Sequence, residues 1–127
     1  MSIKSNPLWL KMDAIRQLCR GKSFAYEEHI DRFTWGANNS TEKPTDEEIE
    51  TKRQELINGF AMKLLRRERD RRLAEVDWWT LRASDGIEMT QEQKDYRKAL
   101  RDLPSTATPD INDMLKLINV TWPTKPE

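Results

Sequence analysis

Residues 45–79 read TDEEIETKRQELINGFAMKLLRRERDRRLAEVDWW, and this stretch decides the fold class. It opens with a capping box, in which Thr45 is the cap and Glu48 stands three positions on. The carboxylates of the first turn also suit the positive end of a helix dipole. The stretch therefore predicts a long helix that begins at Asp46.

Apolar residues of the same stretch form two adjacent helical stripes. The first stripe contains Ile49, Leu56, Phe60 and Leu64, and the second contains Ile57, Ala61 and Leu65, continued by Leu73 and Val76. Such a wide apolar face predicts packing against more than one neighbour.

Shorter elements are expected before this helix. Asn6-Pro7 combines a cap with a first-turn proline, so a helix is expected from Pro7 to Arg20. A short helix from Ser23 to Gly36 is expected next, although the aromatic residues there also permit a pair of short strands. Residues 37–44 are polar and turn-prone, and we expect them to separate an N-terminal helical segment, 1–44, from a helical region, 45–127, within one compact unit.

Two further helices are expected after it. Thr90 opens a second capping box, and the helix that follows should end at the breaker Pro104. Thr108-Pro109 repeats the cap-and-proline signal and predicts an amphipathic helix through Ile118. Residues 120–126 contain two prolines and should be extended. The expected fold is therefore mainly α, with a long central helix, short flanking helices and an extended C-terminal Trp-Pro tail.

Composition limits the classes of partner. The chain of 127 residues is one domain's worth, and its 22 basic residues balance its 22 acidic ones. Because its net charge is close to zero, no overall electrostatic attraction draws the chain to nucleic acid or membranes, and self-association is favoured. No apolar stretch approaches the roughly 20 residues of a membrane span. Cys19 stands alone, which predicts a buried free thiol and a reducing compartment.

The chain lacks a recognisable arrangement for catalysis. His29 is the only histidine, and no ligand-spaced cluster surrounds it. Cys19 lies on an apolar stripe, where thiols are usually inert, so a Cys-His pair is not favoured. The four glycines are isolated, which excludes a standard phosphate loop. We expect no catalytic residues, no cofactor and no metal.

Residues 66–72, Arg-Arg-Glu-Arg-Asp-Arg-Arg, carry the strongest local charge. Glu68 can pair with Arg72, and Asp70 with Arg66, each four residues away, so a solvated, self-paired face is favoured. The acidic patch of a protein partner is the second reading, and nucleic acid the least favoured.

Tryptophans are the sharper signal. Trp78 and Trp79 are adjacent on a helix and cannot both face one core, so one should pack inside while the other covers a loop or meets a partner. Trp122-Pro123 is either part of a tail folded back on the helices or an extended peptide offered to another protein. The candidate partner-binding residues are Trp78, Trp79, Tyr96, Arg97, Trp122 and Pro123.

Residues 66–126 resemble the phage tail assembly chaperone family and, more loosely, the C-terminal part of tail fibre assembly proteins. The resemblance is carried by the charged segment 69–75, Asp77-Trp78-Trp79, the helix start 89–93, Tyr96-Arg97, the segment 99–102, Pro104, Trp122-Pro123 and Lys125-Pro126. Residues 105–119 are longer than the family's usual run, and residues 1–65 match no pattern of the family.

The resemblance implies a non-enzymatic protein of virion morphogenesis that binds a tail or tail fibre protein in the cytoplasm of the host bacterium. The alternative is a structural component, an adaptor on the tail, baseplate or fibre, that stays in the virion tail. Both readings imply a protein partner.

Overall fold

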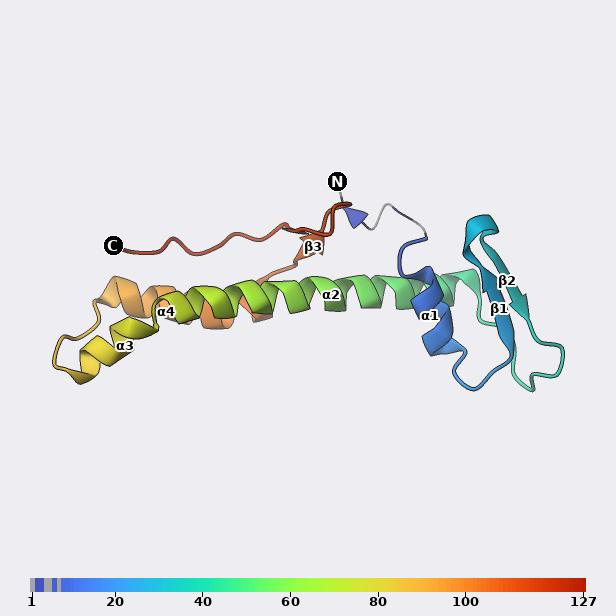
Figure 1. Ribbon diagram of the computed structural model, residues 1–127, viewed down its shortest axis with the longest axis horizontal. Coiled ribbons are helices and arrows are strands. Elements are labelled where there is room, and N and C mark those ends of the chain that lie inside the picture. Colours follow the sequence, from blue (N-terminus) through green and yellow to red (C-terminus); the bar gives the residue numbers. More distant parts are fainter. Residues whose placement is uncertain (1, 4–5, 7) are drawn as a thin grey trace. The chain divides into compact units, whose positions relative to one another are not determined.

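The computed structural model describes residues 2, 3, 6 and 8–127, and helices dominate it (Figure 1). In chain order the elements are α1 (Lys11–Leu18), β1 (Phe24–Glu27), the 3-10 turn η2 (Glu28–Ile30), β2 (Arg32–Trp35), α2 (Asp46–Glu75), α3 (Asp77–Ser84), α4 (Gln91–Thr106), β3 (Asp110–Ile111) and β4 (Leu117–Ile118). The mainly α class with a long central helix and short flanking helices is confirmed. The expected helix start at Pro7 lies outside the described residues, but residues 8–10 form turns, so the first helix begins only at Lys11 and ends at Leu18, before the expected end at Arg20.

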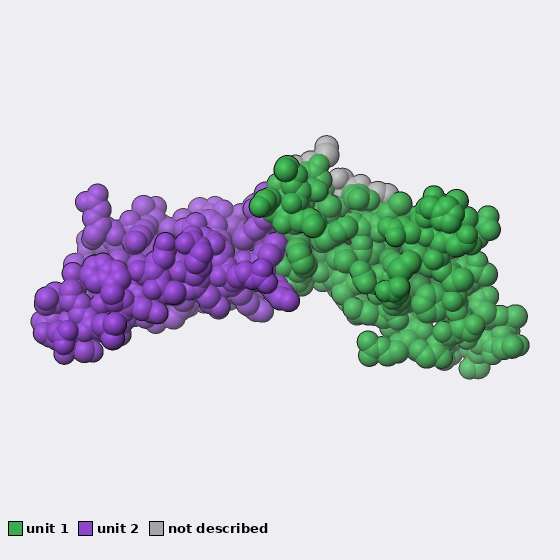
Figure 2. All heavy atoms as spheres, in the orientation of Figure 1, with its two compact units in different colours: residues 1–60, 111–116 green, residues 61–110, 117–127 purple. Residues whose placement is uncertain are grey.

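Contacts divide the chain into two compact units, and the boundary falls inside α2, between Phe60 and Ala61 (Figure 2). Unit 1 contains residues 1–60 and 111–116, and unit 2 contains residues 61–110 and 117–127. Each unit has a buried hydrophobic cluster of its own. No helix of the described residues has both the length and the apolar character to cross a membrane.

The core of unit 1 lies between α1, the start of α2 and a β-hairpin. Its fully buried residues are Ala14, Ile15, Cys19 and Ile49. β1 and β2 pair antiparallel, with Phe24 opposite Trp35 and Tyr26 opposite Phe33. These four aromatic rings pack against the cluster.

The hairpin shows that the short helix expected between Ser23 and Gly36 is wrong and that the strand pair is right. Aromatic residues alternate with exposed ones along both strands, and alternation with a period of two places one set on the buried face. Gly36 follows β2 at the open end of the hairpin, where its amide donates to the Ser23 carbonyl at 2.9 Å and a Cβ would lie 2.7 Å from the Cβ of Ser23.

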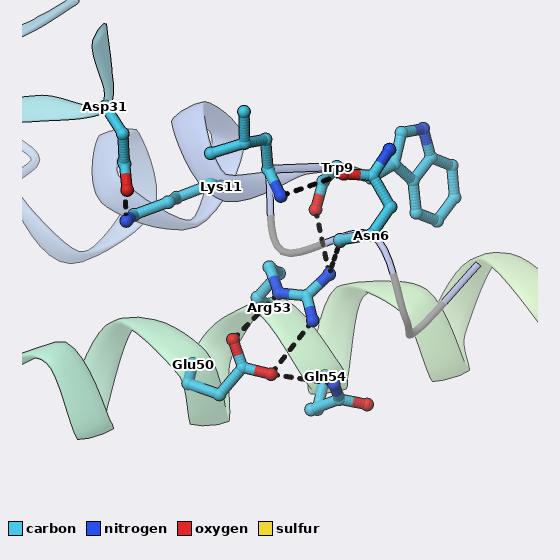
Figure 3. A network of polar contacts seen from close by, with 8 residues as sticks. Asn6, Trp9, Lys11, Asp31, Glu50, Arg53 and Gln54 are labelled. Carbon is cyan, nitrogen blue, oxygen red and sulfur yellow. Dashed lines mark hydrogen bonds and ion pairs between the residues drawn. The ribbon is translucent and has the colours of Figure 1, made fainter. Parts of the chain in front are cut away.

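A buried arginine joins the N-terminal segment to α2 (Figure 3). Arg53 donates from Nη1 to the carbonyl oxygens of Asn6 at 2.8 Å and Trp9 at 3.3 Å. Its Nε and Nη2 donate to the Glu50 carboxylate at 2.8 and 2.9 Å. These bonds lower the pKa of Glu50 to about 2. Arg53 therefore ties Asn6 and Trp9 to α2, a role that the sequence analysis did not identify.

The core of unit 2 lies between α3, α4 and the end of α2. Val76, Trp79, Tyr96 and Leu100 are buried there. The capping box of α4 is confirmed: Thr90 Oγ1 accepts from the Gln93 amide at 3.1 Å, and the Gln93 side chain accepts from the Thr90 amide at 3.0 Å. α4 continues through Pro104 to Thr106, because a proline in the last turn removes only one helical hydrogen bond.

The amphipathic helix expected from Thr108 to Ile118 is wrong, because β3 and β4 form a short two-stranded sheet there. The Asn112 side chain explains the difference. Its Oδ1 accepts from the amides of Met114 at 3.0 Å and Lys116 at 2.8 Å. Such bonds offer the backbone a turn in place of a helix.

Candidate protein-binding surface

Two of the candidate residues form the aromatic centre of unit 2. Trp79 of α3 is only 2% exposed, and its ring lies 6.1 Å from that of Tyr96 of α4 in an edge-on arrangement. Tyr96 is also buried. These two rings join α3 to α4 and do not reach the surface.

Trp78 lies on the other side of α3 and is 50% exposed. Adjacent helix positions differ by about 100° in direction, so burial of Trp79 turns Trp78 outward. The edge of Trp78 still meets Trp79 at 6.1 Å between ring centroids. The expectation that only one of the pair packs inside is confirmed.

Further large apolar side chains are exposed within ten residues of Trp78 in the chain. Leu81 follows it by three positions, on the same side of the helix, and is 70% exposed. Ile87, in the loop after α3, is 57% exposed, and its amide donates to the Arg82 carbonyl at 3.1 Å. We call Trp78, Leu81 and Ile87 the α3 apolar face. Sequence reasoning missed the last two, although the three-residue spacing of Leu81 from Trp78 was a usable signal.

An arginine covers one edge of this face. The Arg82 guanidinium lies over the Trp78 ring, with its central carbon 4.7 Å from the ring centroid. Its Nε is buried and has no hydrogen-bond acceptor among the described residues. The candidate Arg97 of α4 is half-buried, and its Nε also has no acceptor in the described part of the chain.

Trp122 and Pro123 are only partly exposed to solvent. Trp122 is half-buried and packs against the unit 2 core, and Pro123 is half-buried as well. The Arg72 guanidinium stacks on the Trp122 ring at 4.3 Å, while its Nε donates to Glu68 at 3.0 Å. The structure thus has the Trp122 ring folded back on unit 2.

The basic stretch of α2 largely pairs with itself. Glu68 accepts from Arg71 at 2.7 Å and from Arg72 at 3.0 Å, and these bonds lower the pKa of its carboxyl group. Asp70 pairs with its neighbour Arg69 at 2.9 Å, so the expected pair with Arg66 is wrong. A solvated, self-paired face therefore describes residues 66–72 better than a surface for nucleic acid.

Groups with chemical reactivity are not gathered at any site that the structure describes. Cys19 is buried, and burial raises the pKa of its thiol. His29 is exposed in the turn between β1 and β2. No group of three or more His, Cys, Asp or Glu residues is placed to hold a metal ion within residues 2, 3, 6 and 8–127.

Comparison with protein families gives a match to the second half of the chain. The family described as phage tail assembly chaperone protein matches residues 62–127. The matched range includes α3, α4 and Trp122. Comparison with curated proteins finds no match, and neither does comparison with solved structures. The family match covers more than half of the chain, which therefore belongs to the phage tail assembly chaperone family.

Proposed function

We propose that this chain is a non-enzymatic chaperone that binds a phage tail or tail fibre protein during tail assembly, in the cytoplasm of the infected bacterium. Membership of the family supports a role in phage tail assembly. The α3 apolar face is the proposed binding surface. The observation that carries this proposal is the exposure of Trp78, Leu81 and Ile87 within ten residues of chain that the family match includes.

Exposed apolar surface of this kind favours association with another protein. Contiguous apolar patches on soluble proteins commonly mark interaction sites, and tryptophan is enriched among the residues that dominate binding energy. A tail protein awaiting assembly has apolar surfaces of its own to cover. Binding to the α3 apolar face would shield such a surface until the tail incorporates it.

The buried candidate residues Trp79 and Tyr96 hold in place the helix that carries this surface. Trp79 and Tyr96 fix α3 against α4, so Trp78 is presented on a rigid element. A rigid contact loses less conformational entropy on binding than a mobile one. In this proposal Trp122 and Pro123 hold the C-terminal segment on unit 2, and Arg97 remains a candidate contact.

Co-expression tests the proposed surface. The tagged chain is expressed with each tail and tail fibre protein of the same phage, as wild type and as the double variant Trp78→Ala, Leu81→Ser. The wild type should retain one of these proteins, and the double variant should lose it while its circular dichroism is unchanged. The matched control is Ile30→Ala, which removes a half-exposed apolar side chain from unit 1. Retention of the tail protein by the double variant would refute the surface.

Mass spectrometry of purified virions tests the chaperone role itself. A chaperone should be abundant in infected lysate and absent from the mature particle. A fixed, symmetric copy number in the virion would support the structural adaptor in place of the chaperone.

A further inference from the structure

Arg82 is held on the α3 apolar face without a counter-charge. Its guanidinium is stacked on Trp78 at 4.7 Å, and its Nε is buried without an acceptor. No ion pair or side-chain hydrogen bond joins it to another residue in the described part of the chain. A guanidinium carries five N–H donors, so this one retains unused hydrogen-bonding capacity beside an exposed apolar surface.

Two other arginines with buried or ring-stacked side chains have a carboxylate, whereas Arg97, like Arg82, has none among the described residues. Arg72 also stacks on a tryptophan, Trp122, and its Nε donates to Glu68 at 3.0 Å. The buried Arg53 is bound by both oxygens of Glu50. The two tryptophan-stacked arginines thus differ in one respect: Arg72 has its acceptor within the chain, and Arg82 does not.

We propose that the bound tail protein supplies an acceptor for the Nη groups of Arg82, which are not among its buried unpaired atoms: an Asp or Glu side chain that pairs with them while apolar side chains next to it cover Trp78 and Leu81. This inference rests on the proposed function and specifies the chemistry of the partner's contact segment. The guanidinium lies over the Trp78 ring and carries a planar fork of donors, which suits a carboxylate that accepts two parallel bonds.

The charges around Arg82 favour a single carboxylate over a polyanion. Asp77 in the first turn of α3 and Asp85 at its end are both exposed, and Glu88 follows in the loop. These carboxylates repel the successive phosphates of a nucleic acid, which need several unpaired cations in a row. One carboxylate flanked by apolar side chains carries a single charge and meets less of that repulsion than a run of phosphates.

The test compares affinities for the tail protein that the co-expression experiment retains. Arg82→Gln should weaken binding about tenfold or more, because a charge-assisted hydrogen bond is lost, and Arg82→Lys should weaken it less. The matched control, Arg67→Gln, removes an exposed arginine of α2 in the same unit and should leave the affinity unchanged. Calorimetry gives the affinities, and circular dichroism checks that each variant is folded.

Charge reversal identifies the partner's residue. Arg82→Glu should abolish binding, and an Asp→Lys or Glu→Lys substitution in the tail protein should restore it. The inference is overturned if Arg82→Gln binds as tightly as wild type while the double variant Trp78→Ala, Leu81→Ser does not, and the proposed function then still stands. If neither variant weakens binding, the proposed surface fails as well.

Two other occupants would also overturn the inference. If truncation of the partner's last residue removes binding and no internal acidic substitution does, the acceptor is a terminal carboxylate. If light scattering shows a dimer of this chain that Arg82→Gln dissociates, the occupant is a second copy.

Discussion

The adjacent residues Trp78 and Trp79 lie in contrasting environments on one helix. Trp79 fills the space between α3 and α4, whereas half of the Trp78 surface remains accessible. The same substitution at the two positions therefore removes very different amounts of packing. That difference separates a residue needed for folding from one available to a partner.

Trp79→Ala should lower the free energy of unfolding by about 3–5 kcal/mol, because it leaves a cavity beside Tyr96. Trp78→Ala should lower it by less than about 1 kcal/mol, in keeping with its partial exposure. Urea unfolding followed by circular dichroism measures both values. Equal losses would mean that Trp78 is also a core residue and would remove it from the proposed binding surface.

Glu50 predicts a pH dependence of stability. Hydrogen bonds from Arg53 lower its pKa to about 2 in the folded chain, from 4.5 without them. A lowered carboxyl pKa stabilises the folded state above the unfolded pKa, and this stabilisation is lost as the pH falls through the folded pKa. Its contribution should therefore be complete above about pH 4.5 and disappear between that pH and about pH 2.

Glu50→Gln should accordingly flatten the fall of unfolding free energy between about pH 4.5 and about pH 2. The control is Glu47→Gln, an exposed carboxyl in the first turn of α2 whose side chain has no hydrogen bond to any described residue. Urea midpoints across this pH range give the comparison. Equal slopes for wild type and Glu50→Gln would contradict the role assigned to the Arg53 pair.

The Arg53 network also marks a limit of sequence reasoning. In the sequence Arg53 is one charged residue among several near the start of α2. Its acceptors at Asn6 and Trp9 are main-chain carbonyls 47 and 44 positions away. No side-chain pattern encodes such a contact, so the burial of Arg53 is visible only in the structure.

At the scale of elements, the two capping boxes predicted their helices well, whereas the cap-and-proline signal at Thr108-Pro109 predicted a helix where the structure has strands. The Thr45 and Thr90 boxes place α2 and α4 correctly, because each cap depends on residues three positions apart. The strands at residues 24–35 and 110–118 depend on turn chemistry instead. In the sequence, Asn112 is compatible with a helix. In the structure, its Oδ1 accepts hydrogen bonds from two amides of the turn.

Thr90→Ala tests the cap of α4. The variant leaves the Gln93 amide without its side-chain acceptor and should lower the free energy of unfolding by about 1 kcal/mol. Thr80→Ala is the matched control, since Thr80 is an exposed residue within α3 and alanine is a better helix former. The two urea midpoints are compared under identical conditions. A loss at position 80 as large as that at position 90 would argue against the capping role.

At the scale of the whole molecule, the family match and the division into two units nearly agree. Residues 62–127 carry the family match and almost coincide with unit 2 plus the β3–β4 turn. Sequence reasoning located the candidate surface through its tryptophans but missed Leu81 and Arg82. Exposure of a leucine and lack of an acceptor for an arginine are properties of the folded state, which residue types alone do not reveal.

The boundary between the units lies one residue after Gly59, in the interior of α2. Glycine costs a helix about 1 kcal/mol relative to alanine, and the space where a Cβ would lie at this position is open. Gly59→Ala should therefore raise the free energy of unfolding by about 0.5–1 kcal/mol. A decrease on thermal or urea unfolding would show that α2 needs the glycine for another reason.

Gly59→Pro tests whether the continuous backbone of α2 couples the folding of the two cores. A proline in a helix interior removes a hydrogen bond, clashes with the preceding turn and costs about 3 kcal/mol or more. Hydrogen exchange measured by mass spectrometry should show residues 14–19 and 96–100 opening together in the wild type. In Gly59→Pro the two segments should open at different urea concentrations, because each cluster then unfolds by itself. Joint opening in the proline variant would mean that an intact α2 is not required for cooperative unfolding, and separate opening already in the wild type would mean that the helix does not couple the cores.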